Sequence, residues 1–330
     1  MQRRDFISMI GGAAAANVLP RAASAQQGER VRHIGVLTVL ANDAEGQARV
    51  GAFEEGLRQL GWSEGRNLRI DRRWPAGETD RLKMHAAELV RLKPSVILAG
   101  GSRALQALQQ ETKTIPTVFV ATDSAAVERS IQSLARPGGN VTGFTLFEFS
   151  IVGKMLETLK KTVPAMMRTA IIFHPDNPSA PGYARVFENA APALNVKPVI
   201  ASVRSAGDIE RVINEISREP NGGLIVAADQ FAVLHRELIV AMAAQRKLPV
   251  IYAYRTFIPI GGLMSYGANI YDLYRQAASY VDRILKGTRP DELPVQTPIR
   301  YELIINLKIA KTLGIEIPPQ VLALADEVIE

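Results

Sequence analysis

Residues 95–121, SVILAGGSRALQALQQETKTIPTVFVA, hold two short apolar segments on either side of a longer amphipathic one. Segments 95–99 and 117–121 have the length and composition of buried strands, whereas 103–111 is typical of a helix. A strand, a helix and a second strand in this order are typical of parallel strands joined by a crossover helix. This stretch therefore predicts an α/β fold.

The same alternation continues on both sides and divides the chain into two halves. A turn cluster at 136–140 and a break near 138–147 separate them. In the first half we expect strands at 32–40 and 67–74 and helices at 44–60, 79–92 and 125–134. In the second half we expect strands at 169–173, 196–203, 223–227, 249–253, 262–266 and 301–305, and helices at 148–162, 183–194, 208–218, 232–246, 271–285, 308–313 and 320–328.

The repeated alternation predicts two α/β lobes, each a doubly wound parallel sheet, with a cleft between them. Ligands of such sheets bind beyond the carboxyl ends of the strands. Candidate functional residues are therefore sought at the strand ends.

Composition is that of an ordinary globular protein, with 330 residues, 47% hydrophobic and 22% charged. At about 150 residues per domain, the length suggests two domains. Lys and Arg number 39 against 33 Asp and Glu, which gives a net charge of +6. The basic residues are scattered without interleaved aromatic residues, which argues against nucleic-acid binding. Cysteine is absent, which excludes disulfides, thiolate metal sites and a Cys nucleophile.

Residues 1–25 have the pattern of an export signal. Arg3 and Arg4 precede an apolar, alanine-rich stretch at 7–19, and Ala23 and Ala25 offer a cleavage site. The paired arginines resemble a twin-arginine signal, with a Sec signal as the alternative. The stretch is too short for a membrane anchor, so we expect a periplasmic protein. Removal takes away three arginines and one aspartate, so the net charge falls from +6 to +4.

Sequence motifs of catalysis are missing from the chain. No G-x-G-x-x-G follows a strand, and P-loop, G-x-S-x-G and H-E-x-x-H patterns do not occur. The histidines His33, His85, His174 and His235 are isolated, so we expect each to be a surface or packing residue. We therefore predict a binding protein with no cofactor, no metal and no catalytic residues.

Gly101 and Ser102 follow the first quoted strand and open the helix after it. Glycine allows the backbone to approach a ligand closely, and a helix N-terminus attracts anions. Ser102 is therefore a candidate ligand-binding residue, and capping of the helix is an equal alternative.

The second quoted strand ends at Ala121 and is followed by Thr122 and Asp123. Backbone N–H groups and the Thr122 hydroxyl are suited to hold a carboxylate, whereas Asp123 is as well suited to cap the next helix. Asn42 and Asp43 lie beyond the first strand of the chain and join the candidate set.

Further candidates follow strands of the second half. Asp229 lies between a strand and a helix, so it either meets a ligand ammonium or caps the helix. Tyr252 and Tyr254 offer stacking surface, and we expect one of them to point into the core. Asn177 lies in a Pro-rich turn, where a turn role competes with binding. Ser265 lies where the chain crosses back between the lobes.

Several segments resemble the tryptophan/tyrosine-type ABC transporter substrate-binding proteins. They are GGNVTG at 138–143, GGLMSYG at 261–267, DLYR at 272–275, ELIINLK at 302–308, IPP at 317–319 and ADEVI at 325–329. The similarity covers nearly all of the mature chain. It implies the type I periplasmic-binding fold, in which two lobes joined by three crossovers close on a ligand at a hinge. It also implies a receptor that hands its solute to a membrane permease driven by a cytoplasmic ATPase.

The resemblance also implies lobe bounds and site roles. The implied lobes are 32–144 plus 269–297 for lobe 1, and 145–267 plus 298–330 for lobe 2. By the family pattern, the loops at 101–102 and 122–123 hold a ligand carboxylate, and Asp229 meets its amine. We expect a monomer that binds an amino acid or a similar small carboxylate.

Two departures from the family pattern concern specificity. Residues 38–43 read TVLAND, where the amino-acid binders carry a Gln and a His-Pro-x-Leu-Asp segment, and Ser124 replaces the Pro that usually follows Asp123. Tryptophan or tyrosine specificity is therefore not implied. Two alternatives remain, namely a sensory receptor of the same fold and an exported enzyme that uses Asp123 and Asp229 as acid and base.

Overall fold

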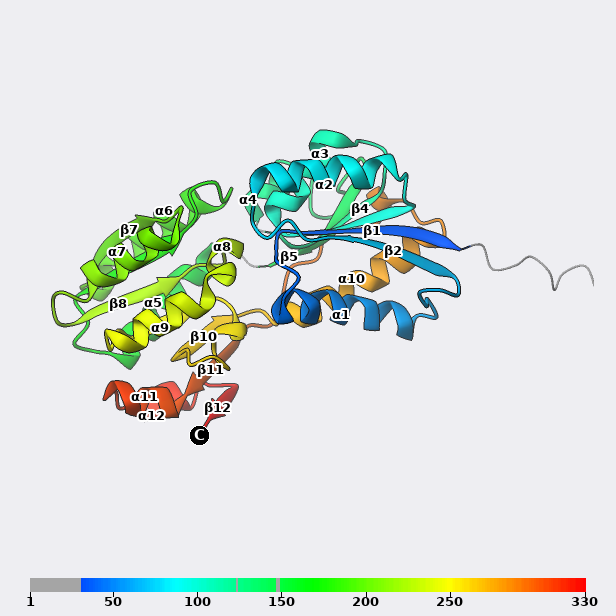
Figure 1. Ribbon diagram of the computed structural model, residues 1–330. Helices are drawn as coiled ribbons and strands as arrows, with labels where there is room; N and C mark the ends of the chain where they lie inside the picture. The colour runs from blue at the N-terminus through cyan, green and yellow to red at the C-terminus, as the bar shows by residue number, and fades with distance from the viewer. Residues whose placement is uncertain (1–30, 123, 147–148) are drawn as a thin grey trace, which may run out of the picture.

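The computed structural model describes residues 31–122, 124–146 and 149–330. Asp123 and the export signal expected at 1–25 lie outside the described residues. Figure 1 shows two lobes side by side, each a sheet with helices on both faces. In the described part of the chain, no helix has both the length and the apolar character needed to cross a membrane.

Lobe 1 is built on a parallel five-stranded sheet with the order β2-β1-β3-β4-β5. Helices α1 and α10 pack together on one face, and α2 and α3 on the other (Figure 1). Because both faces are covered, β3 and β4 are buried along their whole length. The elements of lobe 1 are β1 (Arg32–Thr38), α1 (Ala44–Gln59), β2 (Leu68–Arg73), α2 (Thr79–Arg91), β3 (Val96–Gly100), α3 (Ser102–Glu111), β4 (Thr117–Thr122), α4 (Ser124–Glu128), β5 (Val141–Thr145), α10 (Ile270–Leu285) and η3 (Pro290–Glu292).

Lobe 2 is built on a seven-stranded sheet with the order β12-β11-β10-β9-β8-β6-β7. Strands β10, β9, β8, β6 and β7 are parallel, whereas β11 runs antiparallel to β10 and β12 runs parallel to β11. Helices α5 and α6 pack together, and α7 packs with α9. The elements of lobe 2 are α5 (Ser150–Thr162), β6 (Arg168–Phe173), α6 (Ala180–Ala190), η1 (Pro192–Leu194), β7 (Lys197–Ser202), α7 (Ala206–Ile216), β8 (Gly222–Val226), α8 (Gln230–Leu234), α9 (Arg236–Gln245), β9 (Val250–Tyr252), η2 (Arg255–Phe257), β10 (Met264–Gly267), β11 (Glu302–Asn306), α11 (Leu307–Leu313), α12 (Pro319–Leu322) and β12 (Glu327–Ile329).

The chain passes between the lobes three times. It leaves lobe 1 after β5, returns from β10 to α10, and leaves again between η3 and β11. At the last passage Gln296 pairs with Phe144, and its backbone N–H donates to the Gly143 carbonyl at 2.9 Å. Two of the connecting segments are therefore hydrogen-bonded neighbours.

The structure differs from the expected elements at five places. Segment 183–194 divides into α6, which begins earlier at Ala180, and η1. The region near 138–147, expected to be a break, contains strand β5. Segment 125–134 forms only the short helix α4, which begins at Ser124. Segment 232–246 divides into α8 and α9, and segment 320–328 contains α12 followed by the strand β12.

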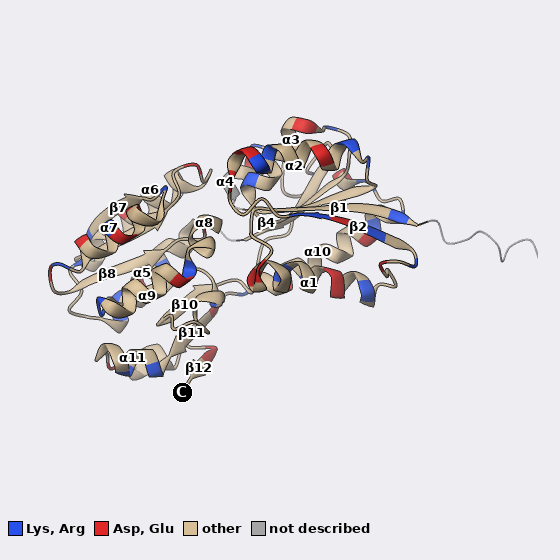
Figure 2. Ribbon diagram, viewed as in Figure 1, with Lys and Arg blue, Asp and Glu red and all other residues tan. Residues whose placement is uncertain are grey.

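Charged residues of both signs are spread over the helices and loops of the two lobes (Figure 2). The edge strand β2 carries several of them. Arg72 lies between Glu54 and Glu64 at 2.6 and 2.7 Å, and Arg73 pairs with Glu88 at 3.0 Å. Charges along an edge strand oppose pairing with another chain.

Candidate functional site

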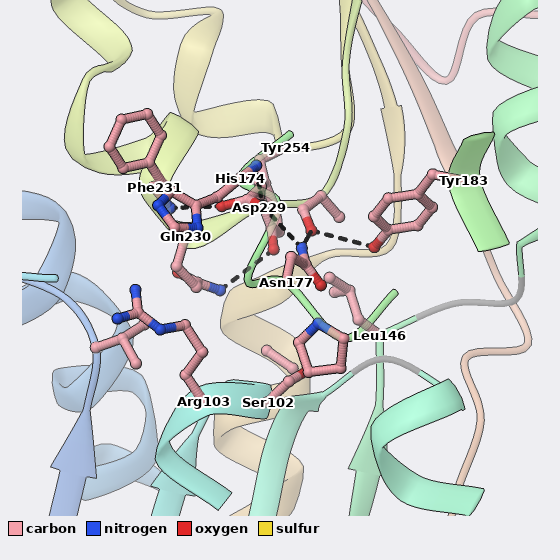
Figure 3. Close-up of a pocket in the computed structure, with 14 residues that line it drawn as sticks. Ser102, Arg103, Leu146, His174, Asn177, Tyr183, Asp229, Gln230, Phe231 and Tyr254 are labelled. Carbon is pink, nitrogen blue, oxygen red and sulfur yellow. Dashed lines mark hydrogen bonds between the residues drawn. The ribbon is translucent and has the colours of Figure 1, made fainter. Parts of the chain in front are cut away.

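A cavity lies between the lobes, beyond the carboxyl ends of strands in both sheets (Figure 3). The lining residues are Val39, Ser102, Arg103, Ala121, Leu146, His174, Asn177, Pro178, Tyr183, Ala228, Asp229, Gln230, Phe231 and Tyr254.

Two backbone turns shape the wall that lobe 1 provides. Gly101 has φ +99° and is the N-cap residue of α3, so the N-cap itself offers no side chain to the helix. Ser102 and Arg103, the first residues of α3, line the cavity, so the positive end of this helix faces a ligand. Ala121 has φ +56° at a register shift in β4, a conformation that costs energy for any residue with a Cβ.

Asp229 organises the wall that lobe 2 provides. Its Oδ1 accepts from the Phe231 N–H at 2.7 Å and caps α8. Its Oδ2 accepts from the His174 N–H at 2.9 Å and from Asn177 Nδ2 at 2.8 Å. The side chain is nearly fully buried, with an exposed fraction of 4%. Asp229 therefore joins the loop after β6 to the end of β8.

His174 lines the cavity as a neutral imidazole. Its Nδ1 accepts from the Asp176 N–H at 3.1 Å, which places the ring proton on Nε2. Burial lowers the pKa of His174 and outweighs the opposite effect of Asp229 and Asp176. The ring packs against Phe231, with 5.0 Å between ring centroids.

Arg103 brings a guanidinium from lobe 1 to the same cavity (Figure 3). Its Nη2 donates to the Gly77 carbonyl at 3.2 Å and to Thr79 Oγ1 at 2.6 Å. These two bonds fix the side chain at the rim of lobe 1. In the described residues we find no carboxylate within ion-pair distance of Arg103.

Gln230 connects the cavity wall to the interior of lobe 1. Its Nε2 donates to the Tyr254 hydroxyl at 3.3 Å, and its Oε1 accepts from Arg49 Nη1 at 3.2 Å. Arg49 lies on α1 with its guanidinium 5.0 Å from the centre of the Tyr254 ring. The Gln230 amide is thus held by partners from both lobes.

The structure brings five of the sequence-predicted residues together at the cavity. They are Ser102, Ala121, Asn177, Asp229 and Tyr254. Gly101 does not line the cavity with a side chain, but it sets the turn beside it.

The remaining predicted residues lie elsewhere. Asn42 is exposed and accepts from Gln47, and Asp43 caps α1 and pairs with Arg236 of lobe 2 at 2.9 Å. Thr122 and Ser265 are buried within β4 and β10.

Tyr252 lies in the core of lobe 2, stacked on Phe257 with 4.4 Å between ring centroids. This stacking occupies its ring within the lobe, so of the two predicted tyrosines only Tyr254 reaches the cavity.

Sequence reasoning missed several lining residues. His174 directly follows β6, so the strand-end rule points to it, but its isolation favoured a packing role. Arg103 and Gln230 occupy first turns of helices, where a polar residue carries no signal of its own.

Comparisons with known proteins agree over nearly the whole chain. A family model described as ABC transporter substrate binding protein matches residues 33–329. The tyrosine-binding protein of Clostridioides difficile is 23% identical over 288 residues, which span 87% of this chain and 82% of that protein.

Two solved structures match both lobes. A conserved domain protein from Vibrio cholerae has a TM-score of 0.84 at 28% identity, covering 91% of this chain and 100% of that chain. The ABC domain of Streptococcus pneumoniae in complex with L-Trp has a TM-score of 0.83 at 22% identity, with the same coverage.

Proposed function

This chain belongs to the family of ABC transporter substrate-binding proteins, and on that premise we propose that it captures a small carboxylate between its lobes and delivers it to a membrane permease. The fold is of the type I periplasmic-binding class. Members of the family bind their solute without transforming it, so the chain is not an enzyme. Proteins of this family are typically extracytoplasmic.

The observation that carries the proposal is a cavity lined by both lobes. Ser102 and Arg103 come from lobe 1, whereas Asn177, Asp229 and Tyr254 come from lobe 2. A ligand that contacts both walls stabilises the closed arrangement over the open one. The three passages between the lobes supply the hinge about which they close.

A carboxylate is supported by the end of α3 and by the relatives. The N-terminus of α3, where Ser102 and Arg103 line the cavity, brings positive potential to an anion. One relative is named for tyrosine and another was solved with L-Trp, and both of these molecules carry a carboxylate. Phe231 and Tyr254 offer apolar surface for the rest of the solute.

The cellular setting completes the proposal. We infer that residues 1–25 direct export and are removed near Ala25, and that the mature monomer acts in the periplasm. The lobes that close are 32–144 plus 269–297, and 145–267 plus 298–330. A permease driven by a cytoplasmic ATPase then takes the solute from the closed protein.

The test is a thermal-shift and calorimetric screen of the exported protein against amino acids, aromatic acids and small carboxylates. A ligand present at a hundred times its Kd should stabilise the fold by about 2.7 kcal/mol. Small-angle scattering should show a smaller radius of gyration on binding. Conversion of the ligand into a product, or strongest stabilisation by a solute without an acid group, would contradict the proposal.

A pair of variants locates the binding. Pro178→Trp should fill the cavity and abolish the stabilisation, because Pro178 lines it. Ile200→Trp adds the same side chain at an exposed position of the edge strand β7 and should leave binding unchanged. Equal behaviour of the two variants would place the ligand outside this cavity.

A further inference from the structure

Among the polar groups that line the cavity, the hydrogen-bond acceptors are bonded to other protein groups to a greater extent than the donors are. Asn177 Oδ1 accepts from the Ser179 N–H at 3.0 Å, and Gln230 Oε1 accepts from Arg49. The Ala228 carbonyl accepts from Asn177 Nδ2 at 3.4 Å and from the Tyr183 hydroxyl at 3.2 Å. These acceptors of the cavity wall are therefore already bonded to the protein.

The Asp229 carboxylate is also largely occupied. It accepts three hydrogen bonds from its own lobe, two on Oδ2 and one on Oδ1. A carboxylate accepts about four, so little remains for a ligand ammonium, which brings three donors. An ammonium at Asp229 could take only the one remaining acceptor position without replacing bonds that hold the His174 loop and cap α8.

Donors on both walls, in contrast, are unused within the described residues. The Nε and Nη1 groups of Arg103 make no hydrogen bond there, and neither does the Nε2–H of His174. Both side chains line the cavity, one from each lobe (Figure 3). The Arg103 charge lies close enough to His174 to oppose protonation of its ring.

The charges around Arg103 also favour an anion. Lys83 lines the adjoining cavity together with Arg103 and Asp176. Asp176 itself pairs with Arg204 at 3.1 Å, so its charge is shared with a second cation. Apart from Asp229, whose carboxylate already accepts three hydrogen bonds, the described charges near Arg103 are two cations and the paired Asp176, and this balance favours a carboxylate over an ammonium.

We propose that the solute is a small organic acid without an α-ammonium group, held by the Arg103 guanidinium from lobe 1 and the His174 imidazole from lobe 2. This inference rests on the proposed function and narrows its ligand class. Acceptor oxygens of the acid take the unused donors of both walls, so the same contacts that select the acid also hold the lobes together.

The experiment is calorimetry of the exported protein with matched ligand pairs. L-tyrosine is paired with 3-(4-hydroxyphenyl)propionate, L-tryptophan with indole-3-propionate, and L-glutamate with glutarate. In the pair that binds, the acid without the amine should bind about tenfold or more tightly than the amino acid. Tighter binding of the amino acid would overturn this inference and leave the proposed function intact. Failure of every acid and every amino acid would reject the carboxylate class itself, and the inference with it.

Variants assign the contacts. Arg103→Gln and His174→Phe should each weaken the acid by about tenfold and change the affinity for the corresponding neutral carboxamide much less. General loosening of the site would weaken both ligands equally and would argue against the assignment. Arg211→Gln, an exposed arginine on α7, is the matched control and should leave both affinities unchanged.

Discussion

At the scale of single residues, the buried pair of Arg49 and Glu45 is the most consequential feature outside the cavity. Arg49 has no exposed surface, and its Nε donates to Glu45 at 2.6 Å. Glu45 also accepts from the Thr256 hydroxyl at 2.6 Å and from the Tyr271 hydroxyl at 2.8 Å. The carboxylate is thus satisfied by residues of both lobes, and its charge is balanced only while Arg49 is present.

Replacement of Arg49 should therefore be costly. Arg49→Met leaves the Glu45 carboxylate buried without a cation, which we expect to cost about 3–5 kcal/mol of unfolding free energy in urea titrations. The double variant Arg49→Met with Glu45→Gln should recover part of that loss. Arg58→Met breaks an exposed pair with Glu55 and should change stability by about 0.5 kcal/mol or less. A loss as small in Arg49→Met as in this control would contradict the argument.

A second residue-scale prediction concerns pH. Burial lowers the pKa of His174 below its ordinary value of 6.5, so the unfolded chain takes up this proton more readily than the folded one. The contribution to stability is complete above 6.5 and is lost as the pH falls toward the lower folded value.

The measurement compares unfolding free energies of the wild type and His174→Gln between about pH 7 and pH 5. Glutamine keeps an acceptor for the Asp176 N–H but does not titrate. The wild type should lose stability relative to the variant on acidification. Parallel profiles of the two proteins would show that His174 does not contribute.

A site residue could be predicted from the sequence where it lies next to a recognisable strand end. It could not be predicted where contacts with distant parts of the chain place it. Ser102, Ala121 and Asp229 lie within three residues of the ends of strands, so the strand-end rule finds them. Asp43 satisfies the same rule, yet it caps α1 and pairs with Arg236, because α1 begins immediately after this loop. Arg103 reaches the cavity only through its contacts with Gly77 and Thr79, which no local pattern encodes.

At the scale of elements, α1 and α10 show how closely two helices approach in lobe 1. A Cβ on Gly56 would lie 2.7 Å from the Arg275 carbonyl oxygen and 2.8 Å from the Ala278 Cβ. Glycine is therefore required where α1 crosses α10. Gly51, on the same helix, has no neighbouring atom within 4 Å of the place its Cβ would take.

The two glycines give a matched prediction. Gly51→Ala should stabilise the protein by about 0.4–1 kcal/mol, because it reduces the freedom of the unfolded chain without a clash. Gly56→Ala should destabilise it by about 1–3 kcal/mol, because the helices must separate. Thermal unfolding of both variants is the measurement, and a gain in stability from Gly56→Ala would refute the close packing.

Strands could be predicted from the sequence where their burial requires an uninterrupted run of apolar residues. Strands β1, β3, β4, β6 and β8 are apolar runs, and their expected positions match the structure within a residue or two. Strand β5 was not expected, because Gly143 interrupts its apolar pattern. A Cβ there would come 2.0 Å from the Phe119 carbonyl oxygen, so pairing with β4 requires the glycine that hides the strand.

At the scale of the whole molecule, contacts between the lobes lie beside the cavity as well as within it. Asp43 of lobe 1 pairs with Arg236 of lobe 2 at 2.9 Å. Glu45 accepts from Thr256 across the same boundary, and Gly77 lies against the side chain of Leu234. These contacts exist only when the lobes are close, so they favour closure before any ligand binds.

The pair of Asp43 and Arg236 allows this bias to be measured. Arg236→Gln and Asp43→Asn each remove one charge, and asparagine caps α1 as well as aspartate does. A smaller closed population lowers ligand affinity by the same factor, because binding must then supply the free energy of closure. We expect each single variant to bind about two- to tenfold more weakly and to have a larger radius of gyration without ligand.

The double variant should be no weaker than either single variant, because the pair is already broken. Arg255→Gln breaks a pair with Glu302 inside lobe 2 and should change neither quantity. Additive losses in the double variant, or unchanged scattering in the single ones, would mean that the pair does not control closure.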